Sequence, residues 1–314
     1  MPESQPGEAL VDMESPIRLS ILMVTYNSSS TIKVCLESVF KELELLEGEV
    51  IVVDNKSSDD TVSILDEFLT QNPKLKVVLN RTNRGFAVGN NQALEMARGQ
   101  HILILNPDTI IQNGILPDLL RELEKDAKTG AIAPRLQFPD GRLQKTCRRF
   151  PTHMDVIYNV FGLSALYPES RRFNGWKMGD FDHQSAQKVE QPAGAALLVR
   201  GDLLKALNGF DENFPMFFND VDLCKRIKDA GYTIWYLPDY VIQHLGGASV
   251  KQVKMKMTIS SHVSFFRYFE KHFTRMYQQP LNFIVGILLY LSLIPRLLIL
   301  LIFKGQRTAS RETL

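Results

Sequence analysis

The stretch His101-Ile-Leu-Ile-Leu105, followed at once by Asn106-Pro107-Asp108, decides the fold of this chain. An apolar run that stops on a polar turn is typical of a buried parallel strand, and it would deliver Asp108 to the carboxyl edge of the sheet. In open α/β folds this edge is where ligands bind. Asn-Pro-Asp is also ordinary turn chemistry, so the interpretation depends on whether other strands end in the same way.

Two earlier apolar segments also end on polar residues. Leu19–Val24 runs into Thr25-Tyr26-Asn27, and Val50–Val53 runs into Asp54-Asn55. Because parallel strands share one carboxyl edge, all three polar endings are expected to face the same site. For Asp54 a helix-capping loop is an alternative interpretation, and the two are compatible.

Strand and helix patterns alternate over residues 19–123, which predicts βαβ units and an α/β fold with a mostly parallel, Rossmann-like sheet flanked by helices. The expected strands are 19–24, 50–53, 75–79 and 101–105, and the expected helices are 32–46, 59–69, 86–98 and 115–123. The third helix should stop at Gly99 as a C-terminal cap. Beyond residue 130 the pattern loosens, with strands expected at 131–138 and 195–199 and a helix from Asp220 to Ala230 that ends at Gly231.

The composition excludes several classes of protein. The chain has 314 residues and a net charge of +1, which argues against a nucleic-acid binder with a basic surface. Its three cysteines form no Cys-x-x-Cys pair, so neither a disulfide framework nor a zinc site is expected. Residues 1–16 are polar and acidic without an apolar signal core, and we expect a disordered arm there.

The C-terminal part differs in kind from the rest. Residues 281–303 are almost wholly apolar, and a helix of about 21 residues extends about 31 Å, roughly the thickness of a bilayer core. Basic residues lie on both sides of the segment, which favours both ends staying in the cytosol, with Pro295-Arg296 near a bend. We therefore expect residues 261–314 to form an amphipathic and apolar membrane-associated tail, either as a single span or as a re-entrant or in-plane hairpin.

The three strand ends carry the residue types that a sugar nucleotide needs. A carboxylate can accept a hydrogen bond from the base, polar groups can hold the ribose, and Mg²⁺ or Mn²⁺ bound through one or two carboxylates can neutralise the diphosphate. Asp54 suits the first of these roles and Asp108 the last.

Six segments together resemble the family 2 glycosyltransferases, which have the GT-A fold. They are Val24-Thr-Tyr-Asn27, Val52-Val-Asp-Asn55, Asn83-Arg-Gly-Phe-Ala-Val-Gly-Asn-Asn91, Leu105-Asn-Pro-Asp-Thr109, Phe217-Phe-Asn-Asp-Val-Asp-Leu-Cys-Lys-Arg226 and His244-Leu-Gly-Gly-Ala-Ser249. The set covers residues 18–250 in the family's order and spacing. The Asn-Pro-Asp variant looks most like bacterial rhamnosyltransferase-type members.

The resemblance implies a nucleotide-sugar-binding half over residues 17–130 and an acceptor and catalytic half of the same domain over residues 131–260. The residues expected to contact the donor are Thr25, Asn27, Asp54, Asn55, Arg84, Gly85, Asn106 and Arg226. Within this set Asp54 would face the nucleobase and Asn106 would lie near the ribose. Arg84 and Gly85 precede a helix whose amino end can face the diphosphate. For Arg226, pairing with an acid is an equal alternative.

The same resemblance implies a divalent cation, Mg²⁺ or Mn²⁺, bound by Asp108. Asn106 replaces the first acid of the family's acidic triplet, so a second metal carboxylate is lost. His244 is then expected to supply another metal ligand or a contact to the diphosphate.

Asp220 is the expected catalytic base. Inverting transfer needs a group that removes a proton from the acceptor hydroxyl, and a carboxylate at a helix start in the cleft suits that task. The family's usual Glu-Asp pair reads Asn219-Asp220 here, so there is less reason for a raised pKa. Asp222 is the rival, although a first-turn acid is also favoured by the helix dipole alone.

The function implied is transfer of one sugar, with rhamnose from dTDP-rhamnose favoured, to a hydroxyl of a glycan or lipid-linked acceptor in cell-surface polysaccharide synthesis. The tail would place the enzyme on membrane lipids at the cytoplasmic face of the inner membrane. The basic cluster Arg142, Lys145, Arg148 and Arg149 is either a solvated face or a contact to anionic headgroups or a lipid-linked diphosphate. A nucleotidylyltransferase and an inactive membrane scaffold are the alternatives. A processive synthase is disfavoured because neither tryptophan lies in a Gln-x-x-Arg-Trp element.

Overall fold

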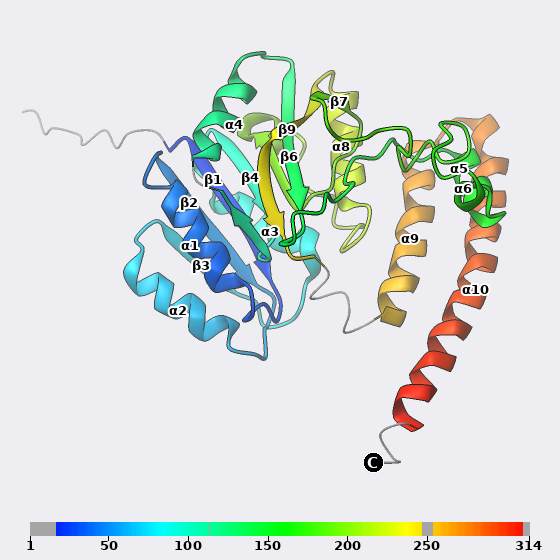
Figure 1. The fold of residues 1–314 in the computed structure, drawn as a ribbon, viewed down its shortest axis with the longest axis horizontal. Helices are drawn as coiled ribbons and strands as arrows, with labels where there is room; N and C mark the ends of the chain where they lie inside the picture. Colours follow the sequence, from blue (N-terminus) through cyan, green and yellow to red (C-terminus); the bar gives the residue numbers. More distant parts are fainter. Residues whose placement is uncertain (1–16, 113, 247–253, 310–314) are drawn as a thin grey trace, which may run out of the picture.

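The computed structural model of the protein describes residues 17–112, 114–246 and 254–309, and it contains a twisted sheet with helices on both faces (Figure 1). The first half of the sheet is parallel throughout, in the order β3 (Leu75–Leu79), β2 (Gly48–Asp54), β1 (Leu19–Thr25) and β4 (His101–Leu105). The predicted strands are confirmed here to within a few residues. Thr25 lies opposite Asp54 in the register, so the polar ends of β1 and β2 meet.

The second half of the sheet is mixed. β8 (Ala196–Arg200) is antiparallel to β4 and to β6 (Thr129–Gln137), while β9 (Thr233–His244) runs parallel to β6. Two short strands, β5 (Thr109–Ile111) and β7 (Gln187–Val189), pair antiparallel with β9. The prediction of a mostly parallel sheet therefore holds for the first half, and both halves share one sheet through the β4–β8 pairing.

Alternation of apolar side chains in the central strands explains why helices cover both faces. Ile21 and Met23 point to one face and Leu22 to the other, as expected when side chains alternate along a strand. The helices on the first face are α1 (Ile32–Glu42), α2 (Thr61–Gln71) and α4 (Ile115–Glu124), and those on the second are α3 (Gly85–Met96), α7 (Gly201–Ala206) and α8 (Asn219–Asp229). All the helices predicted up to residue 230 are present.

Gly99 differs from its predicted role. Helix α3 ends at Met96, and Ala97 already has an extended conformation, so Gly99 lies beyond the helix and does not cap it. A Cβ atom at Gly99 would lie 2.4 Å from the backbone nitrogen of Ser20. Glycine is needed here because the chain passes so close to β1. Gly231, by contrast, follows α8 with φ +88° and is the predicted helix end.

The remaining helices form a group beside the sheet (Figure 1). They are α5 (His153–Val160), α6 (Leu163–Leu166), α9 (Lys254–His272) and α10 (Gln279–Ala309), with the 3₁₀ turn η2 (Met276–Gln278) before α10. α9 and α10 lie side by side and run in opposite directions. α10 continues through Pro295 as one helix, so the chain reverses between α9 and α10 and not at the predicted bend.

Helix α10 has two different faces. Val285 and Leu289 are buried against Val156 of α5 and Phe269 of α9, and His153 of α5 hydrogen-bonds Asn282 at 2.7 Å. A second set of α10 side chains, by contrast, is exposed: Phe283, Ile284, Ile287, Tyr290, Leu291 and Ile294. Residues 276–297 are long and apolar enough to cross a membrane, with a mean hydropathy of 1.6 in their most apolar window. Membrane association of the tail stays a prediction, and the expected arm at 1–16 lies outside the described residues.

Candidate active site

The ends of β1 and β2 form a closed hydrogen-bond network. Asp54 is buried and accepts from the Thr25 hydroxyl at 2.8 Å, the Ser57 hydroxyl at 2.5 Å and the Ser57 backbone N–H at 2.8 Å. Asn27, at φ +50°, accepts from the Ser58 N–H at 2.8 Å. Both Asp54 oxygens are thus occupied within the loop, which confirms the loop as local structure. Contact of Asp54 with a base stays a prediction.

Asn55 joins this edge to the loop before α3. Its side-chain amide donates to the Gly85 carbonyl at 3.0 Å and accepts from the Arg84 N–H at 3.3 Å. Gly85 has φ +84°, and a Cβ there would lie 2.9 Å from the Pro215 carbonyl oxygen, so only glycine fits between the two halves. The Arg84 side chain is exposed at the amino end of α3, where an anion would be favoured.

Pairing of β5 with β9 brings Asp108 and His244 together. Thr109 lies opposite His244 in the register, and Asp108 Oδ1 is 3.3 Å from His244 Nε2. Asn106 Nδ2 lies 3.5 Å from the same ring nitrogen. Residues that are 136 positions apart in sequence therefore meet beyond the end of β4, as the metal hypothesis requires.

Gln144, which sequence reasoning missed, fixes the tautomer of His244. Its amide nitrogen donates to the His244 carbonyl at 2.6 Å, so its oxygen must be the atom 2.8 Å from His244 Nδ1. Because that oxygen can only accept, Nδ1 carries a proton and the neutral ring presents a lone pair at Nε2. Two lone-pair-bearing atoms, Nε2 and Asp108 Oδ1, then face each other, and a divalent cation between them would satisfy both.

Two side chains, Asp108 and His244, could bind Mg²⁺ or Mn²⁺ here. Within the described ranges, no group of three or more His, Cys, Asp or Glu side chains is placed to hold a metal ion. Mg²⁺ commonly binds with one or two carboxylates, keeping waters and substrate phosphates as its other ligands. The Asp108–His244 pair suits an ion that arrives with, or is completed by, a diphosphate.

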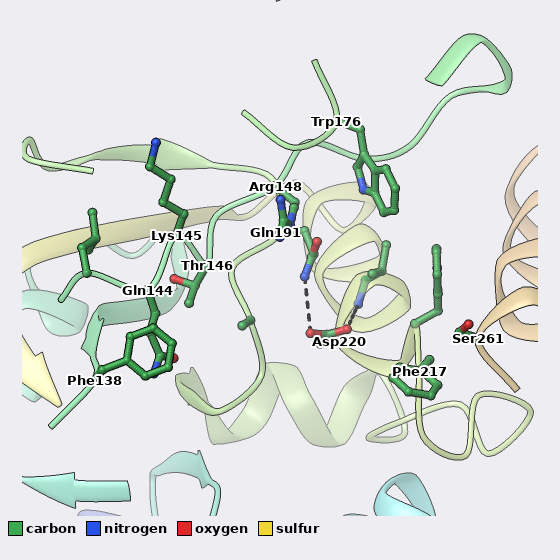
Figure 2. Close-up of a pocket in the computed structure, with 14 residues that line it drawn as sticks. Phe138, Gln144, Lys145, Thr146, Arg148, Trp176, Gln191, Phe217, Asp220 and Ser261 are labelled. Carbon is green, nitrogen blue, oxygen red and sulfur yellow. Dashed lines mark hydrogen bonds between the residues drawn. The ribbon is translucent and has the colours of Figure 1, made fainter. Parts of the chain in front are cut away.

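Asp220 lies at the start of α8 and lines a cleft of about 520 Å³ (Figure 2). Its Oδ2 accepts from the Gly194 N–H at 3.1 Å and from Gln191 Nε2 at 3.3 Å, and its Oδ1 accepts from the Val221 N–H at 2.9 Å. Burial raises the pKa of Asp220, and these hydrogen bonds do not cancel that effect. Asn219 replaces the neighbouring acid that was expected to raise the pKa of Asp220. Burial has the same effect in its place. Gln144 lines the same cleft, which links Asp220 to the His244 pair.

Asp222 and Arg226 are structural residues of α8. Asp222 is fully buried and pairs with Arg226 at 2.7 Å, with Lys271 at 2.6 Å and with His272 at 2.8 Å. Burial alone would raise the pKa of Asp222, but hydrogen bonds from His272 and Lys271 and the charge of Arg226 lower it to about 2. Such a carboxylate is a poor proton acceptor near neutral pH, which disfavours Asp222 as the base.

The remaining guanidinium nitrogens of Arg226 are also occupied. Nη1 donates to the Leu207 carbonyl at 2.7 Å and Nη2 to the Gly209 carbonyl at 2.8 Å. Arg226 thus makes the acid pair that was its alternative interpretation, while its contact with the donor stays a prediction.

Comparison with known proteins decides the family. The family model described as "Glycosyl transferase family 2" matches residues 20–183. The chain belongs to glycosyltransferase family 2. An N-acetylglucosaminyl-diphospho-decaprenol L-rhamnosyltransferase of Mycobacterium tuberculosis is 24% identical over 280 residues, which cover 84% of this chain and 88% of that protein. A Sinorhizobium fredii protein is 26% identical over 77% of this chain, but the chain spans only 26% of its length.

Solved structures of other glycosyltransferases share the fold. A mannosyltransferase of Pyrobaculum calidifontis, solved with GDP-Man and Mn²⁺, has a TM-score of 0.57 and 18% identity, and the match covers 97% of this chain and 84% of that one. TarS of S. aureus has a TM-score of 0.52 and 19% identity, with 89% and 82% of the two chains covered. The GT-A fold expected for this family 2 glycosyltransferase is confirmed.

Proposed function

We propose that the protein is an inverting, metal-dependent glycosyltransferase that moves a single sugar from a nucleotide-sugar donor to an acceptor hydroxyl. The observation that carries the proposal is the shared cleft. Asp220, with its raised pKa, lies in the cleft that Gln144 also lines, and Gln144 holds His244 Nε2 toward Asp108. Gln144 thus connects the cleft that holds the proposed base to the candidate cation site, as transfer from a diphosphate leaving group requires.

In the proposed reaction, Asp220 accepts the proton of the acceptor hydroxyl as its oxygen attacks the anomeric carbon. The new carbon–oxygen bond forms while the bond to the diphosphate oxygen breaks, and the nucleoside diphosphate leaves. Asp108 and His244 would hold the divalent cation, whose role is to neutralise charge on the leaving diphosphate. Gly194 and Gln191 hold the Asp220 carboxylate in place through hydrogen bonds of 3.1 and 3.3 Å.

The donor would bind along the strand ends. Thr25, Asn27, Asp54, Asn55 and Asn106 border this edge, with Asp54 toward the base and Arg84 and Gly85 toward the diphosphate. We favour rhamnose carried by dTDP and a lipid-linked acceptor at the cytoplasmic face of the membrane. The mycobacterial relative, whose name states rhamnosyl transfer to a diphospho-decaprenol, supports this choice.

The test is a panel of nucleotide sugars with purified full-length protein. Thermal shift and donor hydrolysis, measured with Mg²⁺, Mn²⁺ and EDTA, should single out one donor and show stabilisation only with metal. An inactive scaffold would give binding without hydrolysis or transfer for every donor. A nucleotidylyltransferase would instead release pyrophosphate from a nucleoside triphosphate and a sugar phosphate, an outcome that would overturn the proposal.

A further inference from the structure

A second cavity adjoins the catalytic cleft on the side of the helical tail. It has a volume of about 150 Å³ and lies between α5, α9 and α10. Its apolar wall includes Val156, Phe265 and Leu289. Trp176, Phe218 and Ser261 line both this cavity and the cleft that holds Asp220. The cleft and the cavity therefore adjoin at these three side chains.

Three basic side chains gather where the two spaces meet, and one of them, Arg148, is close enough to feel the charge of Asp220. Arg148 lines the cleft, Arg296 lines the cavity, and Lys177 follows the shared Trp176. Burial lowers the pKa of Lys177, and the nearby charges of Arg148 and Arg296 lower it further. Among the described residues, none of the three forms a salt bridge with a carboxylate. Arg149 and Arg142, from the same predicted basic cluster, pair with Asp180 and Asp140.

The other polar groups at this junction leave those charges available. Arg296 Nη1 lies 3.0 Å from His262 Nε2, and His262 Nδ1 lies 2.8 Å from the Thr258 carbonyl oxygen. Because a carbonyl only accepts, Nδ1 carries the proton and His262 is a neutral acceptor for Arg296. The Trp176 indole N–H is buried and has no hydrogen-bond partner among the described residues, although buried donors are rarely left unpaired.

We propose that Arg148, Lys177, Arg296 and the Trp176 N–H bind the phosphate groups of a lipid-linked acceptor, whose first apolar segment enters the cavity between α5, α9 and α10. This inference rests on the proposed function and names the acceptor class of the same site. Phosphate oxygens would pair with the three cations and accept from the indole. The small cavity admits a short apolar segment, and the exposed face of α10 (Phe283, Ile287, Tyr290, Leu291) continues the apolar path toward lipid.

Figure 2 shows why this placement serves the reaction. Arg148, Trp176 and Gln191 border the part of the cleft into which Asp220 projects. An acceptor held by its phosphates at Arg148 and Trp176 would present its sugar toward Asp220, and its lipid would extend away from the base toward α10.

The experiment uses full-length protein in a nonionic detergent, with farnesyl diphosphate as the probe. The chain has two tryptophans, so Trp235→Phe leaves Trp176 as the sole tryptophan, and excitation at the long-wavelength edge of tryptophan absorption avoids the tyrosines. Equilibrium binding of radiolabelled farnesyl diphosphate to protein that retains Trp235 gives a second measurement that does not depend on this substitution. Farnesyl diphosphate should bind and change Trp176 fluorescence, while farnesol and inorganic pyrophosphate should each bind at least about tenfold more weakly.

Matched variants assign the site. Arg148→Gln, Lys177→Gln and Arg296→Gln should each weaken farnesyl diphosphate binding about tenfold or more, since each removes charge-assisted hydrogen bonds. Arg171→Gln removes the same charge from an exposed position in the chain segment that contains Lys177 and should change nothing. Equal weakening by Arg171→Gln would mean general electrostatics and would overturn the proposal.

Two further arms separate this inference from the proposed function. Excess dTDP or UDP with Mg²⁺ should not displace farnesyl diphosphate; displacement would assign the cations to the donor. Pyrophosphate that binds as tightly as farnesyl diphosphate would assign the site to free phosphate. If nucleotides stabilise the protein but farnesyl diphosphate does not bind, the acceptor site is wrong while the transferase proposal stands. If neither binds, both fail.

Discussion

The strand ends around Asp54 and the cleft that holds Asp220 differ in how their polar groups are satisfied. At the strand ends, Asp54 accepts two hydrogen bonds from Ser57 of its own loop and one from Thr25 of β1, and the Asn55 side-chain amide both donates and accepts. In the cleft, burial raises the pKa of Asp220, and the Trp176 N–H has no partner among the described residues. The first region is a preformed frame, whereas the second keeps an unpaired indole N–H and a carboxylate whose raised pKa favours proton transfer.

The largest expected effect comes from Asp220→Asn. The substitution is nearly isosteric and removes proton abstraction, which commonly contributes a factor of about 10²–10⁴ in rate. We expect transfer to fall by that factor, while donor affinity, measured by thermal shift, is kept. The matched control is Asp222→Asn on the same helix. If Asp222→Asn abolishes transfer in folded protein and Asp220→Asn does not, the assignment of the base is wrong.

The cation site should show the next largest effect. Asp108→Ala removes the only carboxylate of the pair with His244, so metal-dependent donor binding and turnover should fall on the order of a hundredfold or more. The thermal unfolding transition should be largely kept, because Asp108 is at a strand-end loop. Asp140→Ala, which removes an acid from an exposed ion pair, is the control. Full turnover of wild-type protein in EDTA would contradict the metal role.

Asp222 should instead govern stability. The substitution Asp222→Asn removes the carboxylate that Arg226, Lys271 and His272 share. Loss of one partner from a buried ion pair costs about 3–5 kcal/mol of folding stability. The pKa of Asp222 is lowered from 3.8 to about 2 in the folded protein. The stability that it contributes is therefore complete above about pH 4 and is lost as the pH falls toward about 2. The free energy of unfolding, measured with denaturant, should differ less between pH 7 and pH 3 for Asp222→Asn than for the wild type. Equal differences for the two proteins would contradict this role.

The smallest effect on the catalytic domain should come from the exposed face of α10. Ile287→Ser with Leu291→Ser makes this face polar, so the protein should shift from the membrane pellet to the supernatant in sedimentation with a carbonate wash. Donor binding should be unchanged. Val285→Ser lies on the buried face against α5 and α9 and should lower thermal stability without this shift. If wild-type protein stays in the supernatant without detergent, the membrane hypothesis fails, and the exposed face must cover another protein surface.

Truncation of the tail would change more than membrane contact. Removing residues 281–314 takes away more than side chains directed at lipid, because Asn282 binds His153 and Val285 packs against Val156 and Phe269. The truncated protein should therefore be less stable around α5 and α9 while the sheet, which ends at His244, keeps its fold. The substitutions on the exposed face are the cleaner test of membrane contact.

Local pattern alone determined the parallel half of the sheet, because each strand there is an apolar run followed by polar residues and a helix with a 3.6-residue apolar stripe. The strands 75–79 and 101–105 have their predicted bounds. The resemblance to the family 2 glycosyltransferases, and not local pattern, implied Asp108 with His244 and Asp220 at a helix start. Local pattern could not predict the role of Gly99, because that role depends on how close this residue lies to the backbone of Ser20 in β1.

Only the tertiary structure showed the different surroundings of Asp220 and Asp222, which the sequence places two residues apart in the first turn of one helix. One side chain enters the cleft and the other meets Lys271 and His272 of α9, about 50 residues further along the chain. Gln144 and Gln191 carried no sequence signal either, because a lone glutamine gains meaning only from what lies opposite it. The pKa of a carboxylate depends on burial and on groups brought close by folding, so chemistry at this site was decided in three dimensions.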